Sequence, residues 1–237
     1  MPFVQAALNG DRKHFAVPKT PDEIAKDTKA VTEAGAHSVH VHAFDNDGNE
    51  TLDGAACGEV LKAIRRLCPG IPVSLTTSAS IEPDPAKRLS LIRSWVEMPE
   101  LVTINQGEEG ILELGQLFLS QGVEIEAGLL SIEDALKFVD WPLRNSCRRV
   151  LIEPLDLDPA VALHNAARIE EIVVNAGIGL EQVHHGYDIA CWAVNERALE
   201  RGHGIRTGLE DIAVLPNGAE AKSNAELVRV AVGMINR

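Results

Sequence analysis

Two histidines lie two positions apart in the segment HSVHVHAF, residues 37–44, which has the composition of a buried β-strand. Because side chains alternate along a strand, His40 and His42 share one face, and Val39 and Val41 share the other. Two neutral imidazoles on one face make half of a zinc, iron or manganese site. A hydrogen-bonded pair of polar residues at a strand end is the alternative, and the spacing alone leaves both interpretations open.

A second group of reactive side chains crowds the segment GIRTGLED, residues 204–211, where Arg206, Glu210 and Asp211 share one loop. A carboxylate from this loop could complete a His-His-carboxylate site with open coordination positions, in which a metal acts as a Lewis acid on a bound carbonyl. A helix cap or a surface Arg-carboxylate pair explains the same spacing equally well.

Most other predicted strand ends are polar, and the chain places these residues there: Asn9, Thr76, Thr77, Thr103, Asn105, Glu153, His184 and His185. Strand ends are commonly polar because the chain turns there, so a structural role accounts for many of them. Glu124 and Glu126 are harder to explain, since they share a face and would be costly inside a barrel unless a cation or metal pairs with them.

The elements that position these residues alternate regularly along the chain. Apolar runs predict eight strands, at residues 3–9, 37–43, 71–77, 101–105, 123–127, 149–153, 182–185 and 204–207. Helical patterns lie between them, with start signals such as Thr20 before Pro21 and Glu23, and Ser223 before Glu226. Eight such units predict a single (β/α)8 TIM barrel over residues 1–237, with an open doubly wound sheet as the alternative.

In a barrel, chemistry collects at the carboxyl ends of the strands, where His40, His42 and the 204–211 loop all lie. The last strand closes against the first, so Glu210 and the two histidines occupy neighbouring sectors of the rim, and a shared metal is geometrically feasible. No GxGxxG follows the first strand and no GxxxxGK[ST] occurs, which removes the usual sequence support for dinucleotide or P-loop binding.

Composition restricts the partners of the protein. Of 237 residues, 45% are hydrophobic and 24% charged, which is typical of a folded globular chain. The formal net charge of -13 disfavours nucleic acid and anionic membrane surfaces, so an anionic substrate must meet a local Arg or Lys. The 4 cysteines form no disulfide-rich pattern, and neither a signal peptide nor an apolar run of about 20 residues is visible. We therefore expect a cytoplasmic protein.

Four segments give the chain a family resemblance: ALNG at 7–10, AGAHSVHVHAFDNDG at 34–48, IRTGLED at 205–211 and SNAELV at 223–228. In this order and spacing, the chain resembles the β-keto acid cleavage enzymes, which include the 3-keto-5-aminohexanoate cleavage enzyme of lysine fermentation. The resemblance implies condensation of a β-keto acid with acetyl-CoA as co-substrate, giving acetoacetate and a new acyl-CoA. It implies no redox cofactor, and it favours a homo-oligomer.

The resemblance also implies roles for particular residues. A zinc ion would be held by His40, His42 and Glu210, and Arg206 and Asp211 would form the catalytic pair. We predict substrate-binding roles for four more residues, namely Thr76, Thr103, Asn105 and Glu126. Glu126 is preferred over Glu124 because it lies nearer the mouth of the barrel.

Because of two departures from the family pattern, the substrate cannot be transferred from the known members. The family's glycine-rich stretch after the third strand is here Thr77-Ser78-Ala79, and Tyr187 follows the HHG motif. A metal-dependent hydrolase or aldolase on the same barrel is the main alternative, because a His-His-Glu site also serves water activation or enolate stabilisation. A barrel that only binds a ligand is a third, which the cluster Arg206, Glu210 and Asp211 argues against. Dependence on acetyl-CoA distinguishes a β-keto acid cleavage enzyme from a hydrolase or aldolase.

Overall fold

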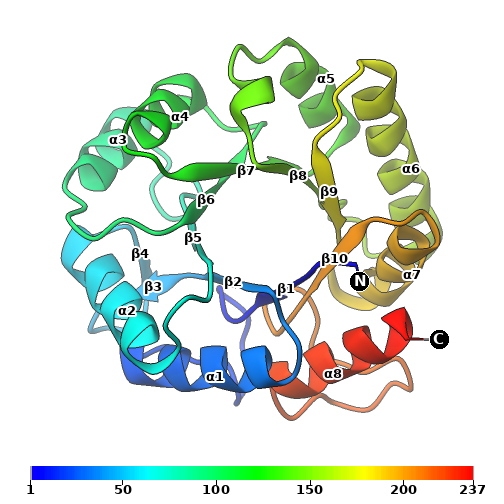
Figure 1. The fold of residues 1–237 in the computed structure, drawn as a ribbon, viewed down its shortest axis with the longest axis horizontal. Helices are drawn as coiled ribbons and strands as arrows, with labels where there is room; N and C mark the ends of the chain where they lie inside the picture. The colour runs from blue at the N-terminus through cyan, green and yellow to red at the C-terminus, as the bar shows by residue number, and fades with distance from the viewer. Residues whose placement is uncertain (1, 237) are drawn as a thin grey trace.

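The computed structural model describes residues 2–236, and its strands close into a parallel eight-stranded barrel (Figure 1). The barrel strands are β1 (Val4–Ala7), β2 (Ser38–Val41), β5 (Val73–Thr76), β6 (Leu101–Asn105), β7 (Glu124–Leu129), β8 (Arg149–Ile152), β9 (Glu181–His184) and β10 (Gly204–Thr207). Around the ring their order is β1-β10-β9-β8-β7-β6-β5-β2, so the last strand pairs with the first. The predicted (β/α)8 barrel is confirmed, and the open doubly wound sheet is excluded.

Helices surround the barrel and separate its strands from solvent (Figure 1). They are α1 (Pro21–Glu33), α2 (Gly54–Leu67), α3 (Pro85–Arg93), α4 (Ile111–Ser120), α5 (Ile132–Asp140), α6 (Pro159–Asn175), α7 (Cys191–Glu200) and α8 (Asn224–Ile235), with short 3-10 turns η1 (Arg144–Ser146) and η2 (Asp188–Ala190). All eight predicted strands are present, and each overlaps its predicted range.

Local signals explain where the helices begin and end. Thr20 caps α1 through the Glu23 backbone N–H, and the Glu23 carboxylate accepts from the Thr20 backbone N–H, which completes a capping box. At the other end, Gly35 adopts a φ of 110°, a conformation that favours glycine, and turns the chain toward β2. The boundaries of α1 therefore follow from residues within a few positions of each end.

A small hairpin follows β2 and was not predicted. Strands β3 (Ala43–Phe44) and β4 (Glu50–Thr51) pair antiparallel outside the barrel. Asp45 Oδ1 accepts from the backbone N–H groups of Asp47 and Asn49, which fixes the turn between the two strands. Strands of two residues are too short to show an alternating pattern, so this hairpin had no periodic signal in the sequence.

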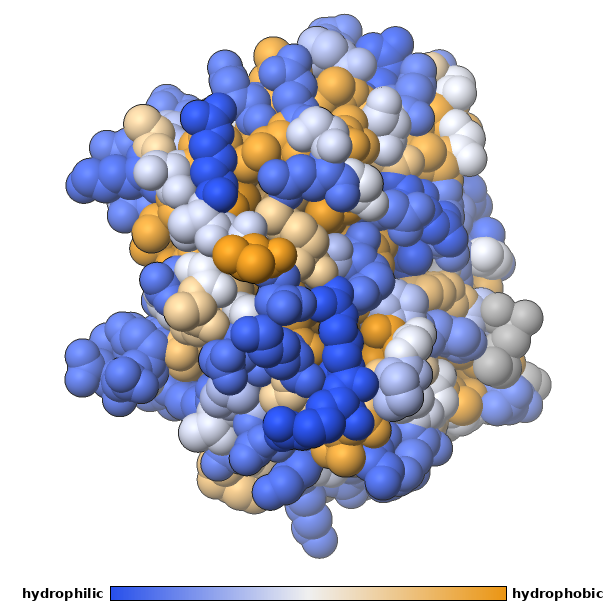
Figure 2. All heavy atoms as spheres, turned by 60° about the vertical axis from the view of Figure 1, so that its left-hand side comes forward, coloured by the Kyte–Doolittle hydropathy of each residue, from blue (hydrophilic) through white to orange (hydrophobic). Residues whose placement is uncertain are grey.

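The surface of the molecule is mixed in polarity. Figure 2 shows one face on which apolar residues occur in small groups among hydrophilic ones. Within residues 2–236, no helix is both long and apolar enough to cross a membrane.

Candidate active site

The mouth of the barrel, at the carboxyl ends of the strands, contains a cavity of about 500 Å³. Eight of the nine predicted site residues line it: His40, His42, Thr76, Thr103, Asn105, Arg206, Glu210 and Asp211. They come from strands β2, β5, β6 and β10 and the loops that follow, which lie in different sectors of the ring. Closure of the barrel therefore gathers residues that are up to 171 positions apart.

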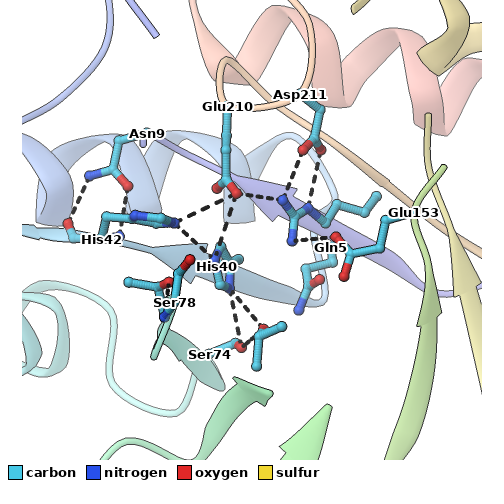
Figure 3. Close-up of polar contacts among 12 residues, drawn as sticks. Gln5, Asn9, His40, His42, Ser74, Ser78, Glu153, Glu210 and Asp211 are labelled. Atoms are coloured by element: carbon cyan, nitrogen blue, oxygen red, sulfur yellow. Dashed lines mark hydrogen bonds and ion pairs between the residues drawn. The ribbon is translucent and has the colours of Figure 1, made fainter. Parts of the chain in front are cut away.

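The two histidines face each other at one side of this cavity. His40 is in β2 and His42 follows its last residue, and their Nε2 atoms are 3.3 Å apart. Glu210, in the loop after β10, places its Oε1 atom 3.8 Å from His40 Nε2 and 3.6 Å from His42 Nε2. Figure 3 shows the Glu210 carboxylate directed at both imidazoles. The predicted triad therefore converges on one point.

Contacts at the other ring nitrogen, Nδ1, orient each imidazole so that its Nε2 atom faces the cavity. His40 Nδ1 lies 3.3 Å from both Ser74 Oγ and Thr103 Oγ1, and His42 Nδ1 contacts the carboxylate of Glu50 from the unpredicted hairpin. Such contacts to the far ring nitrogen are how proteins orient metal-ligating histidines. The chemistry of the donor set, two Nε2 atoms and one carboxylate, fits a divalent metal ion. Glu210 Oε2 is buried without a partner among the described residues, which also fits this assignment.

The electrostatic surroundings of the two imidazoles differ. Burial, and then the positive charge of Arg206, hold the pKa of His40 well below its usual range. Burial also acts to lower the pKa of His42, but the carboxylates of Glu210 and Glu50 outweigh it and raise this pKa to about 9. His42 is thus held against two negative charges that a bound cation would also neutralise.

Arg206 and Asp211 form a buried ion pair beside the triad. Arg206 Nε and Nη2 donate to the two Asp211 carboxylate oxygens at 3.2 and 2.8 Å, and Nη2 also donates to Glu210 Oε1 at 2.6 Å. Arg206 is 3% exposed and Asp211 2%. Burial lowers the pKa of Arg206, but the charges of Asp211 and Glu210 outweigh it and keep this pKa well above its usual range. The guanidinium therefore links the carboxylate of Glu210 to that of Asp211.

Two asparagines position this machinery. Asn9 Oδ1 accepts from the His42 backbone N–H at 2.8 Å, and Asn9 Nδ2 donates to the His42 carbonyl at 3.0 Å (Figure 3). Asn224, at the start of α8, accepts from the Leu209 backbone N–H at 2.6 Å and donates to the Leu8 carbonyl at 2.7 Å. Asn9 was noted from the sequence only as a polar strand-end residue and Asn224 was not singled out, although both lie in the motifs ALNG and SNAELV that carried the resemblance.

Close backbone packing holds the loop that carries Glu210. A Cβ atom on Gly208 would lie 1.9 Å from the Ala7 carbonyl oxygen, so only glycine allows the loop to pass this close to β1. The Glu210 backbone N–H then donates to that same oxygen at 3.4 Å. The motifs ALNG, GLED and SNAELV are therefore one packed unit beside the site.

A further pair in the cavity, Glu153 and His185, was noted in the sequence only as polar strand-end residues. His185 Nε2 lies 2.8 Å from Glu153 Oε2, and His185 Nδ1 lies 3.5 Å from Asp211 Oδ1. Glu153 Oε2 is also 4.0 Å from Arg206 Nη1. The pair therefore extends the charged network of Arg206 and Asp211 across the mouth of the barrel.

Glu126 is the predicted site residue that the structure does not bring to the cavity. It is 0% exposed inside the barrel, where Gln5 Nε2 donates to both carboxylate oxygens at 2.9 and 3.1 Å and Arg149 Nε lies 3.6 Å away. Burial raises the pKa of its carboxyl group, and Arg149 opposes that rise. The alternation of β7 directs Glu126 inward as expected, but below the cavity rather than at its mouth, whereas Glu153, directly after β8, lines the cavity.

A second cluster of potential ligands, Glu170, His184 and His203, lies on the outer side of β9. Here Arg197 and Arg201 donate to the Glu170 carboxylate at 2.6 and 2.5 Å, and His203 contacts it at 3.1 Å. Two guanidinium groups already neutralise this carboxylate, so its arrangement is that of an ion-pair network between helices.

Comparison with known proteins finds relatives over most of the chain. A sequence model of the family described as beta-keto acid cleavage enzyme matches residues 3–137 and 164–237. The 3-keto-5-aminohexanoate cleavage enzyme of Fusobacterium nucleatum is 27% identical over 239 residues, covering 92% of this chain and 83% of that protein. The 3-oxoadipate:acetyl-CoA acetyltransferase of Cupriavidus necator is 28% identical over 257 residues, covering 95% of this chain and 84% of that protein.

Among solved structures, the chain is similar to a ternary complex of ObcA with a C4-CoA adduct and oxalate. The TM-score is 0.76 at 16% identity, and the match covers 93% of this chain and 64% of that one. The chain thus spans less than two thirds of that protein, and the similarity supports the barrel fold alone.

Proposed function

Because the chain belongs to the beta-keto acid cleavage enzyme family, we propose that it condenses a β-keto acid with acetyl-CoA to give acetoacetate and an acyl-CoA. In this reaction the bond between the α- and β-carbons of the keto acid breaks. The acyl part joins the sulfur of CoA, and the acetyl group joins the remaining carboxymethyl part. Relatives named for acetyl-CoA transfer support acetyl-CoA as the second substrate.

The observation that carries this proposal is the convergence of His40, His42 and Glu210 beside the Arg206–Asp211 pair in one cavity. A bound β-keto acid offers a keto oxygen, a carboxylate oxygen and an acidic proton on the carbon between the two groups. The three ligands would hold a zinc ion, which supplies Lewis acidity toward developing negative charge when it is bound. The carboxylate of Asp211 would accept the proton.

Arg206 has two functions in this scheme. Its two hydrogen bonds fix the Asp211 carboxylate, as expected for a planar guanidinium facing a carboxylate. It is also the one Arg or Lys among the residues that line the cavity, and together with the proposed zinc ion it would offset part of the negative charge that an anionic substrate meets in an acidic protein. Thr76, Thr103 and Asn105 provide polar groups on the wall for the substrate to contact.

The test is to incubate the purified protein with a panel of β-keto acids and acetyl-CoA, and to measure acetoacetate and the new acyl-CoA. We expect both products in equal amounts, and neither when acetyl-CoA is omitted. Product formed equally well without a CoA thioester would replace this proposal with a metal-dependent hydrolase or aldolase.

Metal content is a separate prediction. We expect about one divalent metal ion per chain, most of it zinc, in wild-type protein, and less than about a tenth of that in His40→Ala or His42→Ala, because each variant removes one of three ligands. Elemental analysis of the purified proteins measures this directly. His164→Ala, which changes an exposed histidine on α6, is the matched control and should retain the ion. A metal-free but active wild-type protein would contradict the assignment.

A further inference from the structure

Two acceptor oxygens occupy the space above Gly128 on β7, one from each neighbouring strand. A Cβ atom at this position would lie 2.4 Å from Asn105 Oδ1 and 2.6 Å from Glu153 Oε1. Because both oxygens lie so near one point, a single hydrogen-bond donor can contact them together. Glycine at position 128 provides the room for this pair, which we call the acceptor pair.

The orientation of Asn105 is determined by its other contact. Asn105 Nδ2 donates to Glu108 Oε1 at 3.0 Å, and that oxygen also accepts from the Ala79 backbone N–H at 2.9 Å. A carboxylate that accepts a backbone hydrogen bond can receive only the NH2 side of the amide. The carbonyl oxygen of Asn105 must therefore face Gly128 and Glu153.

Glu153 presents the other oxygen. Its Oε2 atom contacts His185, whereas Oε1 is buried and has no partner among the described residues. The whole residue is 7% exposed and lines the cavity, and Figure 3 shows its carboxylate among the polar groups of the site. A buried carboxylate oxygen without a donor is unfavourable, and beside a second acceptor it is more so. The acceptor pair is thus complete only when a donor lies between its two oxygens.

The position of the acceptor pair separates it from the metal-site residues. In the ring of eight strands, β8 lies opposite β2 and β6 lies opposite β10. A β-keto acid whose carboxylate and keto group face His40, His42 and Glu210 would therefore extend its remaining part toward the acceptor pair. Glu153 also lies within residues 138–163, which the family model does not match.

The charge of the cavity indicates the kind of donor. Its lining contains five carboxylates, Asp11, Glu50, Glu153, Glu210 and Asp211, against a single Arg, so even with a divalent ion held by His40, His42 and Glu210 the negative charges exceed the positive ones by two. Arg206 is already paired with two of them. A cationic donor would relieve this excess of negative charge, whereas a neutral one would not.

We infer that Asn105 Oδ1 and Glu153 Oε1 form a subsite for a hydrogen-bond donor on the variable part of the β-keto acid. This inference rests on the proposed function, and the preferred donor is an ammonium group rather than a hydroxyl. Sequence similarity does not decide this feature. Two relatives with almost equal identity, 27% and 28%, are named for an amino-substituted and a dicarboxylic keto acid, respectively.

The test uses three β-keto acids that differ only in bearing an amino, a hydroxyl or a methyl group at one side-chain carbon. Dissociation constants from calorimetry and kcat/KM with acetyl-CoA are measured for wild type and Glu153→Gln. In wild type we expect the amino-substituted β-keto acid to be preferred over the methyl-substituted one by about 10- to 100-fold in both quantities. The hydroxyl-substituted acid should lie between them. In Glu153→Gln the amino-to-methyl ratio should fall at least tenfold, because the amide loses the charge.

Glu196→Gln, an exposed carboxylate on α7, is the matched control, and its amino-to-methyl ratio should equal that of wild type. If the wild-type protein shows no preference for the amino-substituted β-keto acid, the inference is overturned. This measurement does not depend on whether the variant folds. An equal loss for all three acids in Glu153→Gln also overturns it, and equal preference for amino and hydroxyl acids overturns the ammonium assignment. If no acid reacts with acetyl-CoA, the proposed function fails, and the ratio of dissociation constants alone decides the subsite.

Discussion

Asp211 is the residue on which the proposed proton transfer depends. In Asp211→Asn the amide cannot accept a proton at neutral pH and offers Arg206 one oxygen instead of two. We expect kcat to fall by about 10²–10⁴-fold, the usual contribution of a general base, while metal content and secondary structure remain as in wild type. Steady-state kinetics on metal-analysed protein measures this effect.

The variant Arg206→Lys tests the other member of the Arg206–Asp211 ion pair. Lysine keeps the charge but loses the planar fork that contacts Asp211 through Nε and Nη2, so kcat/KM should also fall by at least about tenfold. Near-normal turnover in metal-replete Asp211→Asn would remove Asp211 from the mechanism and reduce the pair to a buried ion pair.

At the scale of elements, the loop after β10 depends on its approach to β1. In Gly208→Ala the new methyl group would meet the Ala7 carbonyl 1.9 Å away, and neither backbone can move without displacing a barrel strand. We expect a loss of about 3 kcal/mol or more in the free energy of unfolding, together with loss of activity, since Glu210 and Asp211 follow directly.

Urea denaturation of Gly208→Ala and Gly179→Ala makes the comparison. Gly179 has no atom within 4 Å of the added Cβ position, so its variant should lie within about 0.5 kcal/mol of wild type. Equal stability of the two variants would show that the approach of the loop to β1 is not restrictive.

Glu170 joins α6 to α7 and to the turn before β10. Burial acts to raise the pKa of Glu170, but hydrogen bonds from Arg201, His203 and Arg197 outweigh it and lower the pKa from 4.5 to about 2. A carboxyl group whose pKa is lower in the folded state than in the unfolded state stabilises the folded state at pH values above its ordinary pKa. This contribution should decline as the pH falls from about 4.5 toward 2.

We therefore expect Glu170→Gln to cost about 2–3 kcal/mol at pH 7, and progressively less below pH 4.5. Urea denaturation across this pH range gives the difference from wild type. Glu171→Gln, which changes an exposed neighbour paired with Arg168, is the control and should cost less than about 0.5 kcal/mol at any pH. A cost for Glu170→Gln that does not change with pH would contradict the electrostatic explanation.

At the scale of the whole molecule, the net charge of -13 opposes the approach of acetyl-CoA, which is itself an anion. Salt screens this repulsion over a distance of about 10 Å at 0.1 M ionic strength. We expect kcat/KM for acetyl-CoA to rise about two- to fivefold between roughly 10 and 150 mM sodium chloride. A fall over this range would indicate a local positive surface that attracts CoA despite the net charge.

Features that depend on neighbours a few residues away were predictable from the amino-acid sequence. The strands follow from short apolar runs, the start of α1 from Thr20 and Glu23, and the shared direction of His40 and His42 from alternation along one strand. These features arise from local backbone geometry, so they are visible without any knowledge of the fold. The eightfold alternation of strands and helices predicted the barrel and left an open doubly wound sheet as the alternative.

Contacts between residues across the barrel depend on how the whole chain folds. The meeting of Glu210 with two histidines 168 or more positions earlier depends on closure of β10 against β1, and its exact placement on the contact between Gly208 and Ala7. The level at which Glu126 lies below the cavity, and the approach of Glu153 to Asn105, depend on the stagger between adjacent strands, which no single segment encodes. The sequence thus indicated the reactive groups, and packing between distant segments determined which of them share one cavity.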